Sequence, residues 1–84
     1  MEVKSYFGPR LRGLRERAGE SRSDLAALLS VSVSQISEME NGRKGTTMER
    51  LALLCTHYKV SADYLLGLAD ELGGGYPCQP LVRI

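Results

Sequence analysis

Residues 21–41 read SRSDLAALLSVSVSQISEMEN, and this stretch decides how the rest of the chain is interpreted. Its first half carries apolar residues at helical spacing, which places them on one face of a helix. Ser21 and Asp24 have the spacing of a capping box, in which two side chains satisfy backbone N–H groups at a helix start. The pattern breaks at Ser30-Val31-Ser32, so this first helix is short.

A second short helix is predicted over residues 33–40, directly after the break. Ser32 and Gln35 again have the spacing of a capping box. Asn41-Gly42 ends the helix, because glycine readily takes the left-handed conformation that follows a last turn. Two short helices joined by about three residues form a helix-turn-helix, whose second helix fits the major groove of DNA.

Three further helices are expected around this pair, which makes the chain all-α, a compact five-helix bundle. One spans about residues 6–18, with Pro9 near its start, where a missing N–H costs little. Another begins after a cap at Thr46 or Thr47, with Glu49 three residues after Thr46. Its apolar stripe consists of Met48, Leu51, Leu54, Cys55 and Tyr58. The last is expected over residues 62–72.

Length and composition point to one domain over residues 1–72, followed by a flexible tail or linker stub over residues 73–84. The net charge is +1, and nine of the eleven basic residues lie in the first 50 positions. Two cysteines and one histidine form no metal-binding motif, so neither a metal nor a cofactor is expected. No signal peptide or membrane-spanning run is present in the sequence, which favours a cytoplasmic protein without membrane contact.

Two stretches carry a resemblance to a known family. They are LRGLRERAGESRSDLAALLSVSVSQISEMENGRK, residues 11–44, and TTMERLALLCTHYKVSADYLLG, residues 46–67. In the order and spacing of their motifs, both resemble the lambda-repressor-like, or Cro/cI-type (Xre), helix-turn-helix DNA-binding domains. The similarity covers about residues 7–67 and implies a lambda-repressor-like fold that binds double-stranded DNA.

The resemblance also implies roles for individual residues. The base-reading positions of the family correspond to Val33, Ser34 and Glu38, with Gln35 and Ser37 nearby. Its phosphate-contacting positions correspond to Ser21, Arg22, Asn41, Arg43 and Lys44. Arg15 and Glu40 match a pair that members often join as a salt bridge between helices. Arg22 departs from the family, which usually has a glutamine there, and a charged side chain suits a phosphate better.

The helix over residues 33–40, called the reading helix below, carries side chains that suggest what they would contact. Val33 suits a thymine methyl group, Ser34 can donate or accept a hydrogen bond, and Glu38 can accept one from the N4 amine of cytosine. Direct readout by this set is expected to be modest, so DNA shape would add specificity. Ser30 stands where the family often has glycine, so the turn is expected to differ slightly.

Leu53, Tyr64 and Leu68 are expected to face outward and to form a homodimer surface. The resulting hypothesis is a transcriptional repressor that binds a palindromic operator as a homodimer. An alternative is an antitoxin-like or other protein-interaction module of the same fold, with residues 73–84 folding on a protein partner. An enzyme is not expected, because paired carboxylates and a phosphate-binding loop are missing from the sequence.

Overall fold

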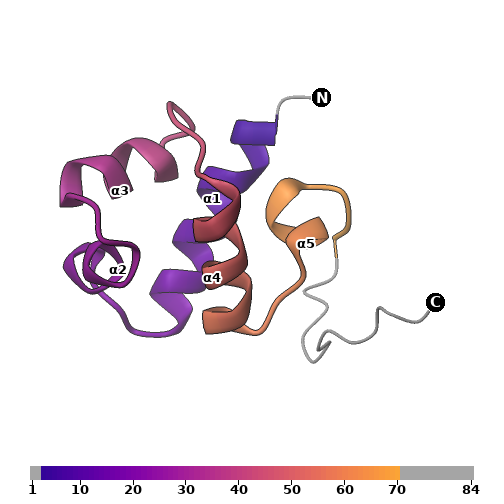
Figure 1. Cartoon of the computed structure of the whole chain (residues 1–84). Coiled ribbons are helices and arrows are strands. Elements are labelled where there is room, and N and C mark those ends of the chain that lie inside the picture. Colours follow the sequence, from indigo (N-terminus) through magenta and orange to yellow (C-terminus); the bar gives the residue numbers. More distant parts are fainter. Residues whose placement is uncertain (1–2, 71–84) are drawn as a thin grey trace.

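A computed structural model describes residues 3–70, which form five α-helices packed around one core (Figure 1). The helices are α1 (Val3–Arg17), α2 (Arg22–Leu29), α3 (Val33–Glu40), α4 (Met48–Tyr58) and α5 (Ala62–Leu66). The predicted all-α, five-helix architecture is therefore confirmed. The tail predicted over residues 73–84 lies outside the described residues.

The two helices of the central pair begin with the capping boxes that the sequence predicts. The Ser21 hydroxyl accepts a hydrogen bond from the Asp24 N–H at 3.1 Å, and the Asp24 carboxylate accepts one from the Ser21 N–H at 3.0 Å. Ser32 and Gln35 repeat this exchange at 3.1 and 3.3 Å. Each cap satisfies backbone donors that a helix start leaves without partners, so both starts are fixed locally.

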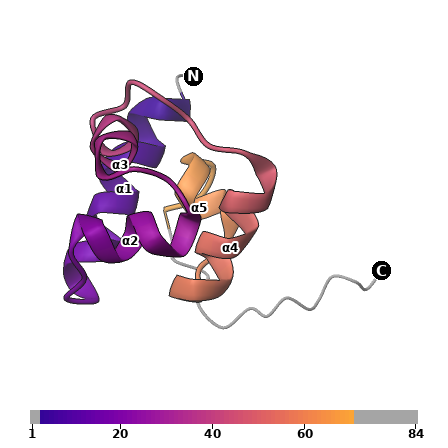
Figure 2. The same cartoon turned by 60° about the vertical axis from the view of Figure 1, so that its left-hand side comes forward.

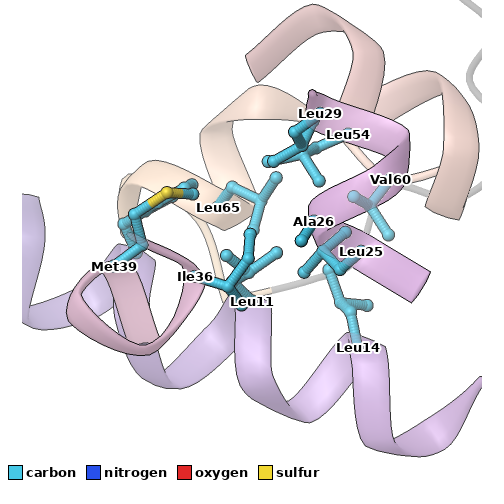
Figure 3. Packing of buried hydrophobic residues seen from close by; sticks show 11 residues of the cluster. Leu11, Leu14, Leu25, Ala26, Leu29, Ile36, Met39, Leu54, Val60 and Leu65 are labelled. Atoms are coloured by element: carbon cyan, nitrogen blue, oxygen red, sulfur yellow. The ribbon is translucent and has the colours of Figure 1, made fainter. Parts of the chain in front are cut away.

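One residue from each helix meets the others at the centre of the core. The five largest side chains that are fully buried are Leu11, Leu25, Ile36, Leu54 and Leu65. Figure 3 shows these side chains converging between the helices, with Met39 and Leu29 filling the periphery. Because α3 contributes Ile36 and Met39 to this core, its opposite face must point away from the protein.

Helix α1 packs against the end of α3 at very short range. A side-chain carbon at Gly8 would lie 2.6 Å from the carbonyl oxygens of both Met39 and Glu40, so only glycine fits there. The helix starts at Val3, earlier than predicted, and Pro9 lies within it rather than near its start. A proline has no N–H group to donate to the carbonyl four residues earlier. Here that carbonyl lies in the exposed first turn of α1, so the structure tolerates Pro9.

Helix α5 ends at Leu66, so the prediction that it continues to residue 72 is wrong. Gly67 ends the helix in the left-handed conformation, with φ of 83°. The ring of Tyr6 lies against the α-carbon of Gly67, where any side chain would collide with it. A tertiary contact from α1 therefore determines where α5 stops.

Helix α4 differs from its prediction at its first turn. Thr47 is the cap, since its hydroxyl accepts a hydrogen bond from the Arg50 N–H at 3.2 Å, and the alternative pairing of Thr46 with Glu49 is not used. Met48 is 79% exposed and does not belong to the core stripe. It is the first residue of α4, one turn before the helix reaches the core. Within residues 3–70, no helix is long and apolar enough to cross a membrane.

The turn between α2 and α3 depends on Ser30, which adopts the left-handed conformation with φ of 58° and ψ of 44°. The N–H groups of Ser30 and Val31 bond to the last turn of α2, at 3.3 Å to Ala27 and 3.0 Å to Ala26. A residue with a side chain is strained in this conformation by about 1–2 kcal/mol. The serine thus makes the turn usually made by glycine.

We expect Ser30→Gly to raise the free energy of unfolding by about 0.5–1 kcal/mol, because relief of strain outweighs the added freedom of the unfolded chain. Urea unfolding followed by circular dichroism measures this change. The control is Ala27→Gly at an exposed position inside α2, which should lower stability by about 1 kcal/mol. A loss of stability in Ser30→Gly would show that the left-handed turn is not strained.

Candidate nucleic-acid interface

Helices α2 and α3 lie against each other at one side of the molecule, with α5 on the far side of α1 (Figures 1 and 2). Buried Ile36 and Met39 hold the inner face of α3. On its outer face, Ser34 is exposed and Val33 is 45% exposed. The structure therefore presents the start of α3 to solvent as a short, mostly polar face.

Three of the predicted base-reading residues are half-buried, and two of these have partners within the protein. Ser37 is half-buried on α3. The side-chain oxygen of Gln35 accepts the Ser32 N–H at 3.3 Å, which leaves its amide N–H₂ as donor for another group. The carboxylate of Glu38 lies 3.4 Å from the ammonium of Lys44. Only Val33 and Ser34 are exposed without such a partner among the described residues.

The loop after α3 folds back onto Glu38. The backbone carbonyl of Glu38 accepts hydrogen bonds from the N–H groups of Arg43 at 2.9 Å and Lys44 at 3.3 Å. Asn41, Arg43 and Lys44 are all exposed. The loop thus places two predicted phosphate contacts beside the last turn of α3. The pairing of Lys44 with Glu38 also reduces the repulsion that this carboxylate would exert on a phosphate.

A buried ion pair joins α1 to the end of α3. Arg15 donates from Nε to Oε2 of Glu40 at 2.6 Å and from Nη2 to Oε1 at 3.3 Å. It also donates from Nη1 to the carbonyl of Glu20 at 2.9 Å. Only 9% of the Arg15 side chain and 1% of the Glu40 side chain are exposed. The hydrogen bond that Arg15 donates to the Glu40 carboxylate raises the pKa of Arg15, so this guanidinium stays charged.

Arg22, a predicted phosphate contact, also bonds to this carboxylate. Its Nε donates to Oε1 of Glu40 at 3.1 Å, and its side chain is 40% exposed. The sequence analysis missed this contact. No local pattern could have found it, because the two residues lie 18 positions apart in the sequence. Ser21, the other predicted contact at this end of α2, is exposed and caps the helix.

The predicted homodimer residues differ in their exposure. Leu53 is 41% exposed and Leu68 is 64% exposed. Tyr64 is half-buried and packs against the core, so it is less exposed than predicted. The guanidinium of Arg10 lies 4.5 Å from the centre of the Tyr64 ring and donates to the carbonyls of Tyr64 and Ala69 at 2.7 and 2.6 Å. Arg10 thereby covers the tyrosine and caps the end of α5.

A second polar cluster, also missed by the sequence analysis, joins the loop before α2 to the end of α4. Glu20 accepts hydrogen bonds from Nε2 of His57 and from the hydroxyl of Tyr58, both at 2.6 Å. Burial alone would raise the pKa of Glu20, but these two hydrogen bonds outweigh it and the pKa is lowered. Burial and the bond to Glu20 both raise the pKa of Tyr58. His57 and Tyr58 follow Glu20 by 37 and 38 positions in the sequence, so no local pattern could have predicted these contacts.

Comparison with known proteins identifies the chain. A family model described as a helix-turn-helix domain matches residues 7–66. The chain belongs to this helix-turn-helix family. Members of the family are DNA-binding transcriptional regulators and not enzymes. The family assignment thus confirms the resemblance to Cro/cI-type domains drawn from the sequence.

Individual relatives agree with this assignment. The chain is 33% identical over 67 residues to the HTH-type transcriptional regulator PrpR of Mycobacterium tuberculosis. The aligned region covers 80% of this helix-turn-helix chain and 14% of PrpR. It is 33% identical over 66 residues to the HTH-type transcriptional regulator ImmR of Bacillus subtilis, covering 79% of the chain and 51% of ImmR. The chain therefore spans no more than about half the length of these two regulators.

A solved structure agrees with the fold. The crystal structure of the restriction-modification controller protein C.AhdI from Aeromonas hydrophila matches with a TM-score of 0.61 and 32% sequence identity. The match covers 75% of this helix-turn-helix chain and 92% of C.AhdI. The similarity thus includes nearly the whole of the C.AhdI chain.

Breaking the buried ion pair should destabilise the domain strongly. We expect Arg15→Ala to lower the free energy of unfolding by about 3–5 kcal/mol, because it leaves the Glu40 carboxylate buried with less compensation. Urea unfolding measures the change. The matched control is Arg12→Ala in the exposed pair with Glu16, where both side chains are 54% exposed; its cost should stay under about 1 kcal/mol. Similar losses in both variants would contradict a special role for Arg15.

The Glu20 cluster predicts a loss of stability in acid. Because the folded state lowers the pKa of Glu20, its contribution is complete at neutral pH and disappears as the pH falls through that lowered value. We expect Glu20→Gln to reduce stability at pH 7 by under about 1 kcal/mol and to flatten the acid side of the stability profile. Tyr58→Phe, which removes one donor and keeps the ring, should flatten it partly. An unchanged acid limb in Glu20→Gln would contradict this contribution.

Proposed function

We propose that this chain is a cytoplasmic, sequence-specific transcriptional repressor that binds a palindromic operator as a homodimer. The observation that supports it most is the orientation of α3. Buried Ile36 and Met39 and the Arg15–Glu40 pair fix this helix, so that Val33 and Ser34 face solvent at the start of a helix of major-groove size.

Bases would be read from the exposed face of α3. Val33 suits a thymine methyl group, and Ser34 suits either a donor or an acceptor on a base edge. The Gln35 amide N–H₂ would donate, because its oxygen is already bonded within the cap. Glu38 would accept from the N4 amine of cytosine, with Lys44 beside it. Ser37 would contribute at the edge of this face.

Phosphates would be held at the start of α2 and on the loop after α3, both beside the last turn of the reading helix α3. Ser21 and Arg22 lie at the start of α2, where the helix dipole favours an anion. Asn41, Arg43 and Lys44 lie on the loop beyond α3. Contacts of this kind set the register of the protein on DNA and carry no sequence information by themselves.

A homodimer would supply the second half-site. One short helix reads few base pairs, and dimers of this type read two half-sites about 34–36 Å apart. Exposed Leu53 and Leu68 support an apolar contact between two copies, and half-buried Tyr64 would add the edge of its ring. Repression would follow when the bound dimer covers a promoter.

The second candidate is an antitoxin-like or other protein-interaction module. The net charge of +1 and the small set of exposed reading side chains support it. In this case residues 73–84 would contact the protein partner. The two candidates differ in their salt dependence, because a protein that neutralises phosphates releases counterions and loses affinity steeply as salt increases.

The proposed function is tested by selecting from a randomised DNA duplex pool with the purified chain, at low and moderate salt. We expect enrichment of a two-fold-symmetric motif and weaker retention at the higher salt. Glu38→Ala should change the base preferred at one position per half-site, by about 1–3 kcal/mol, whereas Arg43→Ala should weaken all sequences alike.

Two variants extend this test. Leu68→Asp should raise the monomer fraction in analytical ultracentrifugation, whereas Met48→Asp, at an exposed residue outside the proposed contact, should not. No enrichment, together with little retention at low salt, would favour the protein-interaction module. An asymmetric motif bound by a monomer would contradict the homodimer.

A further inference from the structure

One carboxylate, that of Glu40, serves two arginines with different surroundings. It accepts three N–H groups, two from Arg15 and one from Arg22, at 2.6, 3.3 and 3.1 Å. Arg15 is buried, whereas the Arg22 side chain is 40% exposed. Two guanidinium groups therefore share the buried Glu40 carboxylate, and Arg22 is the one that reaches solvent. Arg15 has a second carboxylate nearby, that of Glu16 at 3.9 Å from its Nη2.

The bond to Glu40 uses only one edge of the Arg22 guanidinium. Nε is the donor, and neither Nη group of Arg22 has a hydrogen-bond acceptor among residues 3–70. An arginine can bond one anion from Nε and a second anion from its Nη groups, because its five N–H donors are fixed in one plane. Lysine has a single ammonium group, so it cannot bond two anions from two separate edges of its side chain.

We propose that Glu40 is a positioning residue for DNA binding, which orients Arg22 so that its Nη groups face a backbone phosphate at the start of α2. This inference rests on the proposed function. Because Glu40 is the last residue of α3 and Arg22 the first of α2, the bond also sets the distance between the reading helix and the phosphate contact.

The arrangement stabilises the bound state without adding a contact. A long side chain loses rotational freedom when it binds a phosphate, and a side chain already ordered in the free protein loses less. The buried carboxylate is itself held by Arg15, so it cannot follow Arg22 toward the DNA. Arg22 can be replaced while the Arg15–Glu40 pair remains, which separates positioning from folding.

The first test compares lysine and glutamine substitutions at two phosphate-contacting positions. Dissociation constants for the selected duplex are measured with Arg22→Lys and Arg22→Gln, and with Arg43→Lys and Arg43→Gln as matched controls on an exposed loop. We expect Arg22→Lys to weaken binding about tenfold, nearly as much as Arg22→Gln, whereas Arg43→Lys stays close to wild type. Wild-type affinity in Arg22→Lys would overturn the proposal.

The second test is a double-mutant cycle. Glu40→Gln should weaken binding about tenfold beside Arg22 but have little effect in the Arg22→Gln background. If Glu40 acted only as a negative charge near phosphates, Glu40→Gln would instead raise affinity, and equal losses in both backgrounds would also overturn the proposal. Should Glu40→Gln fail to fold by circular dichroism, the comparison of Arg22→Lys with Arg43→Lys decides.

A measurement without DNA distinguishes the two possible failures. In the free protein, NMR should show a slowly exchanging Nε–H signal for Arg22. The loss of this signal in Arg22→Gln assigns it to Arg22. If the wild type shows the signal but binds no duplex, the proposed function and this role are overturned together. Duplex binding without a protected Arg22 signal would overturn the positioning role alone.

Discussion

The buried carboxylate of Glu40 is the constraint on which the arrangement of this domain depends. It ends α3, bonds to Arg15 on α1 and to Arg22 on α2, and has almost no exposure to solvent. A buried charge without partners is very costly, so the three helices must keep the geometry that satisfies it. The backbone contact at Gly8 adds to this, because it brings α1 directly against the end of α3.

Apolar packing and this polar cluster have different effects on the reading helix. One fully buried residue from each helix provides a shared core, which stabilises the bundle and holds the inner face of α3. Directed hydrogen bonds of 2.6–3.3 Å add an angular constraint at the end of α3. The core and Glu40 together give the orientation that presents Val33 and Ser34 to solvent.

The sequence predicts the central pair well because its boundaries depend on local interactions. The Ser21 and Ser32 caps act within three residues, so α2 and α3 begin where the spacing places them. The end of α5 was missed because the ring of Tyr6, 61 positions away from Gly67, determines it. The Arg22–Glu40 bond, 18 positions apart, was missed for the same reason. Prediction failed where tertiary contacts override local preference.

The charges on the reading side explain how a nearly neutral chain can serve a DNA-binding family. Glu40 offsets part of the charge on Arg15 and Arg22, and Lys44 lies beside Glu38. Fewer positive charges are thus available to displace counterions than the number of basic residues suggests, and we expect non-specific attraction to be weak. Affinity then depends on groups held in fixed positions, which penalises any duplex whose phosphates or base edges do not match them. Low net charge therefore favours specificity over general attraction to DNA.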